Sequence, residues 1–125
     1  MVYMKQVIIL YLFLQTFFSC SPKTSARSTV VKDSTPVCIL KRIEEIKKQP
    51  VWSPPAEISE YGYNGQTVYL ITADCCDQFI MLVNKECQVL CAPAGGFTGR
   101  GDEGCPDFFQ RAKLLRVVWK DERGQ

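Results

Sequence analysis

The sequence predicts an α+β fold, in which one N-terminal helix packs on a four- to five-stranded antiparallel meander sheet that disulfides stabilise. Three observations predict it. An apolar helical repeat comes first, and two hairpin patterns and a last strand pattern follow it. Six of the seven cysteines are spread over the same part of the chain, which is too short to bury a large core. We therefore expect a single disulfide-rich domain, residues 36–125.

The apolar residues of the predicted helix recur at helical spacing. They are Ile39, Ile43 and Ile46. Ser34 or Thr35 is the predicted N-cap, and Pro36 falls in the first turn, where a missing N–H costs nothing. Pro50 ends the helix. Cys38 lies at the edge of the apolar stripe, where it is placed to link the helix to the sheet.

Two hairpins are predicted after the helix. The first turns at Asn64-Gly65, a pair that favours a type I′ turn, and the second turns at residues 84–86. The four predicted strands span residues 56–63, 66–73, 76–83 and 87–91. The third strand is apolar on both faces, which predicts a central position in the sheet.

The segment 94–104 has five glycines and is predicted to be an irregular loop. Residues 107–113 are predicted to form a short helical turn. A last strand is expected at residues 114–120. Its predicted core face carries Leu115, Val117 and Trp119.

An even number of cysteines in a small exported domain predicts three disulfides. The residues are Cys38, Cys75, Cys76, Cys87, Cys91 and Cys105. Adjacent Cys75 and Cys76 are expected to bond to different partners, one on the helix side and one on the loop side, because a bond between neighbours requires a strained peptide. The connectivity otherwise stays open. Zinc held by four thiolates is the alternative, and the cysteine spacings fit it poorly.

Residues 1–19 predict a secretory signal peptide. Lys5 is their only charged residue, and an apolar run begins at Val7. The run is shorter than the about 20 residues of a membrane-spanning helix, and the small residue Ser19 precedes the expected cleavage site. The predicted mature chain therefore starts at Cys20.

The sequence Phe17-Phe18-Ser19-Cys20 resembles a bacterial lipobox, although Phe17 stands where leucine is usual. We expect Cys20 to carry lipid, palmitate included, because several acyl chains together give stable membrane attachment. An ordinary signal peptide with a free Cys20 is the alternative. In the lipoprotein interpretation, residues 20–35 are the lipidated cysteine and a flexible polar tether. No acidic run follows Cys20. Such a run would resemble the surface-export signal of some bacterial lipoproteins, so its absence favours the periplasmic face of the outer membrane.

Charge and composition exclude several classes of function. Without residues 1–19, which carry only Lys5, 14 basic and 13 acidic residues remain, so no basic footprint for nucleic acid exists. The sequence has no histidine. This absence excludes histidine-based acid–base catalysis, histidine-containing triads and the commonest metal ligand. We expect no cofactor.

The cysteine and glycine pattern of residues 38–119 resembles an uncharacterised domain family found largely in Bacteroidetes-type lipoproteins. The residues that carry the resemblance are Cys38, Pro54-Pro55-Ala56, Asn64-Gly65, Cys75-Cys76-Asp77 and the run from Cys91 to Cys105. The resemblance implies a fold and an envelope location, and no activity. The outline is also similar to cystatin-type inhibitor folds, at the level of the fold alone.

We expect a non-catalytic binding or interaction module, an inhibitor being one form of it, and take the loop 92–104 as its contact surface. Phe97 and Arg100 are the candidate partner-binding residues, because phenylalanine and arginine recur at protein interfaces. The expected partners are the membrane, through the lipid anchor, and another envelope protein.

Two other classes of function stay open. A purely structural envelope protein is one. The other is a small envelope enzyme that uses carboxylates, although no pair comes with a positioned partner. The candidate carboxylates are Asp74, Asp77, Asp102 and Glu103. Asp102 and Glu103, together with Asp107, are also candidate oxygen ligands for calcium.

Overall fold

The computed structural model describes residues 34–124, which belong to one compact unit, Ser34–Gln125. The signal peptide, the lipid acceptor Cys20 and nearly all of the tether lie outside the described residues, so they stay predictions. Within residues 34–124, no helix is long and apolar enough to cross a membrane.

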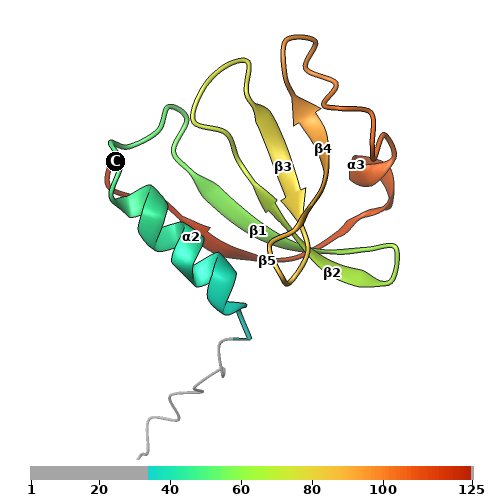
Figure 1. Cartoon of the computed structure of the whole chain (residues 1–125), viewed down its shortest axis with the longest axis horizontal. Helices are drawn as coiled ribbons and strands as arrows, with labels where there is room; N and C mark the ends of the chain where they lie inside the picture. Colours follow the sequence, from blue (N-terminus) through green and yellow to red (C-terminus); the bar gives the residue numbers. More distant parts are fainter. Residues whose placement is uncertain (1–33, 125) are drawn as a thin grey trace, which may run out of the picture. The chain divides into compact units, whose positions relative to one another are not determined.

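One helix is followed by a five-stranded antiparallel sheet (Figure 1). Helix α2 spans Val37–Lys47, and the short helix α3 spans Phe108–Arg111. The strands are β1 (Glu57–Tyr63), β2 (Gln66–Ile71), β3 (Phe79–Val83), β4 (Val89–Gly95) and β5 (Lys113–Lys120). Their order in the sheet is β4-β3-β2-β1-β5. Strands β1 to β4 form a meander and β5 returns to pair with β1, which confirms the predicted α+β class.

The first hairpin forms as predicted, and the second differs at its ends. Asn64 and Gly65 both have positive φ, 48° and 75°, as a type I′ turn requires. Strand β3 begins only at Phe79, because the residues before it form a turn in which the Gln78 N–H donates to the Cys75 carbonyl (3.0 Å). Strand β3 lies between β2 and β4, so its predicted central position is confirmed.

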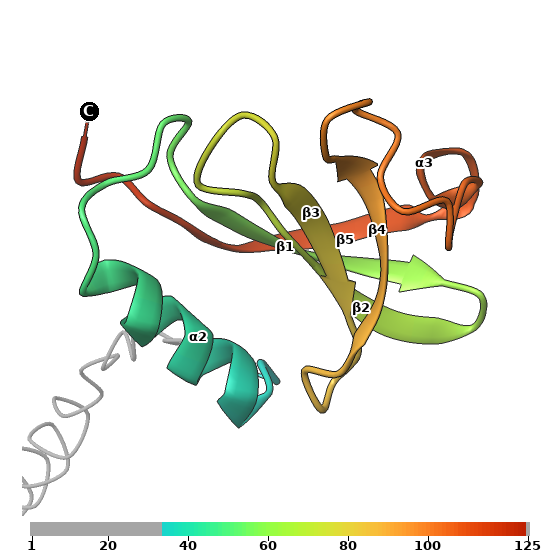
Figure 2. The same ribbon diagram turned by 45° about the horizontal axis from the view of Figure 1, so that its top comes forward.

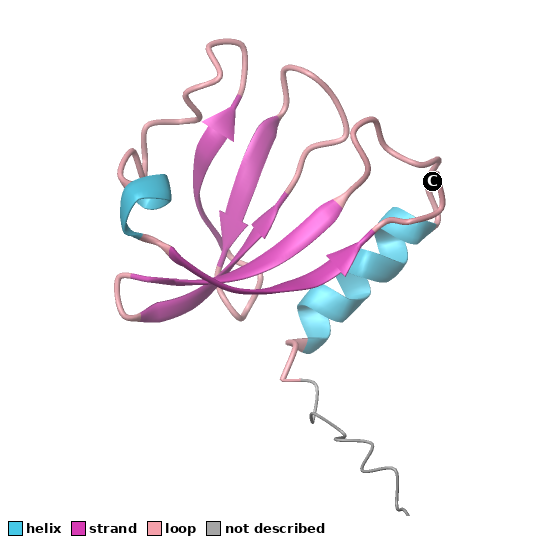
Figure 3. Cartoon of the chain, turned by 180° about the vertical axis from the view of Figure 1, so that it is seen from behind, coloured by secondary structure: helices cyan, strands magenta, loops and turns pink. Residues whose placement is uncertain are grey.

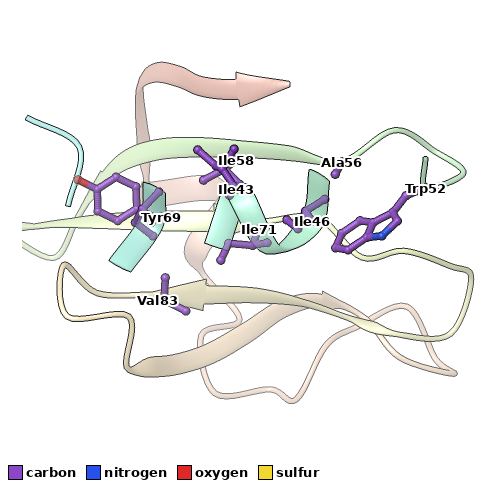
Figure 4. Close-up of a cluster of buried hydrophobic side chains, with 9 residues drawn as sticks. Ile43, Ile46, Trp52, Ala56, Ile58, Tyr69, Ile71 and Val83 are labelled. Carbon is purple, nitrogen blue, oxygen red and sulfur yellow. The ribbon is translucent and has the colours of Figure 1, made fainter. Parts of the chain in front are cut away.

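Side chains from α2 and one face of the sheet form the first hydrophobic cluster (Figure 4). Its buried members are Ile39, Ile43, Ile46, Trp52, Ala56, Ile58, Tyr69, Ile71 and Val83. The three isoleucines of the predicted stripe are all buried, because i, i+4 and i+7 positions share one side of a helix. The cluster joins α2 to β1, β2 and β3.

A second hydrophobic cluster lies on the opposite face of the sheet. Val68 and Leu82 belong to it, whereas their neighbours Tyr69 and Val83 belong to the first cluster, as alternation along a strand requires. Phe108 from α3 completes it and is fully buried. Helices α2 and α3 therefore cover different parts of the sheet and lie far apart (Figure 3). A helix–sheet layer pair alone would leave this second face open.

The start of α2 differs from the prediction. Pro36 is the N-cap residue, and no side chain makes a capping hydrogen bond. Thr35 is buried, and its hydroxyl accepts a hydrogen bond from Arg116 of β5 (2.8 Å). Arg116 also pairs with Glu60 of β1 (2.6 Å). The predicted N-cap is wrong because the Thr35 hydroxyl is hydrogen-bonded to Arg116 of the sheet and does not cap the helix.

The predicted core face of β5 is wrong in part. Leu115 and Val117 are half exposed, whereas Val118 and Trp119 pack against the first cluster. The pairing of β5 with β1 shifts register twice. Such irregularities turn side chains away from simple alternation, so a pattern in the sequence of β5 alone does not identify its inner face.

Candidate functional site

The glycine-rich loop, residues 96–104, folds back along the outer edge of β4. The Gly101 N–H donates to the Gly95 carbonyl (3.0 Å), and the Asp102 N–H donates to the Ala92 carbonyl (2.9 Å). Gly95 and Arg100 form an isolated parallel bridge. These bonds occupy backbone groups that an edge strand otherwise leaves unpaired, and they hold the loop in one shape.

Two glycines are required by close backbone approaches, Gly101 where the loop meets β4 and Gly95 where β4 meets the residue before β3. At Gly101 a Cβ atom would lie 1.8 Å from the Ala92 carbonyl oxygen, and at Gly95 it would lie 2.2 Å from the Gln78 carbonyl oxygen. Both residues also have positive φ, 71° and 83°. Only glycine meets both conditions, so these two positions explain part of the glycine run.

A disulfide closes the base of the loop. Cys91 in β4 bonds to Cys105 at the end of the loop, and both residues are buried. Cys38 of α2 bonds to Cys87 in the β3–β4 connection, which confirms the predicted link between helix and sheet.

The expectation for the remaining two cysteines is wrong. Cys75 and Cys76 bond to each other. They lie on the exposed turn before β3, and both of the partners predicted for them are already taken by the Cys38–Cys87 and Cys91–Cys105 bonds.

Asp102 stabilises the loop from within. Its Oδ1 accepts a hydrogen bond from the Gly104 N–H (2.8 Å). Backbone hydrogen bonds, first that of Gly104, lower the pKa of the Asp102 carboxyl below its ordinary value. The carboxylate of Asp102 therefore acts as a turn-forming group, and its accepting oxygen is turned toward its own backbone.

The two candidate partner-binding residues stand at the tip of the loop. Phe97 is 93% exposed, which makes it the most exposed large apolar side chain of the described residues. Arg100 is also exposed, and its guanidinium makes no hydrogen bond or ion pair within residues 34–124. The structure thus places an aromatic ring and a cation together in solvent on a hydrogen-bonded loop.

The candidate carboxylates do not gather into one site. No group of three or more acidic or cysteine side chains within residues 34–124 is placed to hold a metal ion, so the calcium ligands expected around Asp102 are not brought together. Asp74, Asp77 and Glu103 are exposed. Glu103 has a positive φ of 62° and belongs to the turn.

Sequence reasoning missed the role of Asp107. Its carboxylate accepts hydrogen bonds from the Tyr63 hydroxyl (2.6 Å) and from Arg111 (2.8 Å). The bond from Tyr63, followed by that from Arg111, lowers the pKa of Asp107, and the same carboxylate raises the pKa of Tyr63. The spacing from Asp107 to Arg111 is the i, i+4 spacing of helical ion pairs, and this signal could have predicted that half of the contact.

Fold and site together define a small disulfide-bonded α+β domain that presents a pinned, glycine-rich loop. Residues 44–121 match the model of a domain of unknown function, DUF6970, and the chain belongs to this family. The match confirms that the domain is an uncharacterised one. Neither a curated protein nor a solved structure matches the chain.

Proposed function

We propose that the protein is a non-catalytic binding module of the cell envelope, which contacts a partner protein through Phe97 and Arg100. The observation that carries the proposal is the exposure of Phe97: its ring is 93% exposed on a loop that hydrogen bonds and a disulfide hold in place. An exposed phenylalanine on an ordered loop is available to a partner, and burial of its ring on binding would contribute apolar contact area.

The fixed shape of the loop supports binding. Ordering a flexible loop on association costs conformational entropy, and a loop that is already ordered avoids most of that cost. Phenylalanine supplies apolar area, and arginine supplies directional donors and is frequent at the energetic centres of interfaces. Phe97 and Arg100 offer both within one turn.

The proposal includes attachment to the membrane. The lipobox-like sequence before Cys20 and the polar segment after it support a lipidated N-terminus and a tether, with the domain facing the periplasm from the outer membrane. Cys20→Ala should leave the protein soluble or unprocessed, as cell fractionation and mass spectrometry of the N-terminus would report. Normal cleavage and membrane retention of this variant would contradict the anchor and leave the loop proposal standing.

The loop proposal is tested by photo-cross-linking in intact cells from position 98, an exposed threonine between the two candidate residues. We expect a discrete adduct with an envelope protein, which Phe97→Ala combined with Arg100→Ala removes. The free energy of unfolding of the double variant should stay within about 0.5 kcal/mol of the wild-type value, because neither side chain is packed.

The matched control is Val37→Ala combined with Lys113→Ala. It also removes one exposed apolar and one exposed basic side chain, both outside the loop. This control should keep the adduct. An adduct that survives in the loop variant, or the lack of any discrete adduct, would contradict the proposal.

A further inference from the structure

Helix α2 covers only part of its face of the sheet. Its buried isoleucines belong to a cluster with residues of β1, β2 and β3 and with none of β4, and α2 lies to one side in Figure 1 and in Figure 2, with β4 away from it. A groove of about 430 Å³ remains between the flank of α2 and strands β3 and β4. This volume falls within the range of small-molecule sites, about 300–1,000 Å³.

The floor of the groove is apolar. Trp52, Ile71 and Val83 form its buried part. Phe79 and Val89 border it and are 46% and 58% exposed. The groove therefore offers apolar surface from the first hydrophobic cluster to solvent, and the polar side chains of Thr72 and Gln78 also line it.

The helix wall of the groove is basic. Lys41 and Arg42 line it together with Glu45. Arg42 pairs with Glu45 at 3.4 Å, and both side chains are nearly half exposed. The Lys41 ammonium makes no ion pair or hydrogen bond within residues 34–124. The wall therefore carries a net positive charge, with one cation available to a ligand.

We propose that this groove binds an amphipathic monocarboxylate, a medium-length alkyl chain with an anionic head. The alkyl chain would lie on the apolar floor, and the carboxylate would face Lys41 on the helix wall. A neutral or cationic amphiphile would gain the same apolar contacts and lack the ion pair. This site is separate from the glycine-rich loop and does not rest on the function proposed for Phe97.

The test is a titration of the unit Ser34–Gln125 with sodium decanoate, below its micelle concentration and at low salt, followed by amide NMR. This unit contains both hydrophobic clusters and three disulfides, so it has the elements of an independent fold. Amide shifts should be concentrated at residues 38–45 and 71–89. The half-exposed apolar residues of β5, Leu114, Leu115 and Val117, are an internal reference for unspecific adsorption.

Two variants separate the chain contact from the head contact. Val89→Glu should weaken decanoate binding at least tenfold, whereas Val117→Glu, a matched half-exposed strand valine off the groove, should leave it unchanged. Lys41→Ala should weaken binding about threefold, as expected for an exposed ion pair, and Lys113→Ala should not. Decyltrimethylammonium should bind less tightly than decanoate by more than that factor, because the net positive charge of the helix wall also repels its head group.

Shifts spread equally over β5 and the groove, or equal effects of Val89→Glu and Val117→Glu, would overturn the proposed site. Equal binding of the cationic amphiphile would overturn its anion selectivity. Phe97→Ala should leave decanoate binding unchanged, so that failure of the loop proposal and failure of the groove proposal are distinguishable.

Discussion

At the scale of single residues, two glycines of the loop differ in how well a side chain would be tolerated. Gly101 lies against the Ala92 carbonyl, where any Cβ atom would overlap the backbone. Gly99 has almost the same φ, 73° against 71°, but nothing lies within 4 Å of its Cβ position. Substitution of Gly99 therefore tests the cost of a side chain at positive φ alone, whereas substitution of Gly101 adds the cost of steric overlap.

Gly101→Ala should destabilise the domain by more than about 3 kcal/mol, because strain and backbone overlap add. Gly99→Ala should cost only the about 1–2 kcal/mol of a left-handed conformation. Chemical denaturation of both variants measures the difference. Equal losses would mean that the loop does not lie against β4 as described.

In the C-terminal segment, the buried carboxylate of Asp121 forms a polar contact with the partly exposed guanidinium of Arg123. Asp121 is 1% exposed, and Arg123 binds it through Nε (2.8 Å) and Nη2 (2.6 Å). Arg123 Nη1 also donates to the carbonyls of Lys47 (2.7 Å) and Gln49 (3.2 Å), at the end of α2. A guanidinium at a helix C-terminus satisfies free carbonyls and opposes the negative end of the dipole.

Hydrogen bonds from Arg123 lower the pKa of Asp121 below its ordinary value. The contact therefore contributes stability above the ordinary aspartate pKa, about 3.9, and loses it as the pH falls through the lowered value. Asp121→Asn should lower the unfolding midpoint at pH 7 and flatten the loss of stability in acid. Arg123→Gln should flatten the same region. Acid unfolding curves parallel to that of the wild type would contradict this assignment.

At the scale of elements, α3 is the shorter of the two helices within residues 34–124, and its Phe108 belongs to the second hydrophobic cluster. The Phe108 ring meets the rings of Tyr61, Tyr63 and Phe109 edge to face, at centroid distances of 5.1, 5.2 and 5.1 Å. Phe108 is fully buried, whereas Phe109 is 59% exposed. Two adjacent phenylalanines thus differ sharply in burial.

Phe108→Ala should destabilise the domain by about 3–5 kcal/mol, the usual cost of removing a buried aromatic side chain. Phe109→Ala is the matched control and should cost about 1 kcal/mol, the value of one aromatic pair. Thermal and denaturant unfolding measure both. A larger loss for Phe109→Ala would mean that α3 turns its other side toward the sheet.

At the scale of the whole molecule, disulfides join segments that the sheet does not. The Cys38–Cys87 bond closes 49 residues of chain, and the Cys91–Cys105 bond closes 14. The Cys75–Cys76 bond joins neighbours and closes no loop. In the chain-entropy account, stabilisation grows with the length of the loop that is closed.

When both cysteines of one disulfide are replaced by serine, the loss of stability should increase with the length of the loop that the disulfide closes. Loss of Cys38–Cys87 should cost about 4 kcal/mol and loss of Cys91–Cys105 about 3 kcal/mol. Cys75→Ser with Cys76→Ser should cost less than about 0.5 kcal/mol, as a change on an exposed turn. Unreduced mass spectrometry should show no free thiol in the wild-type domain. A large loss for the 75–76 pair would mean that these cysteines bond elsewhere.

Three structural elements could be predicted from residues that are near neighbours in the sequence. The isoleucine spacing in α2, the Asn64-Gly65 turn and the apolar central strand β3 depend on near neighbours along the chain, and each is found in the structure. The sequence also predicts Phe97 and Arg100 as contact residues of the loop; both are exposed in the structure, and their binding of a partner stays a prediction.

Features that depend on contacts between residues distant in sequence could not be predicted and are known only from the tertiary structure. Arg116 removes the Thr35 hydroxyl from helix capping, register shifts expose Leu115, and α3 covers the second face of the sheet. The disulfide partners, and the groove that α2 leaves open, likewise follow from where separate segments meet. Such contacts are set by packing and register, which have no fixed spacing along a chain.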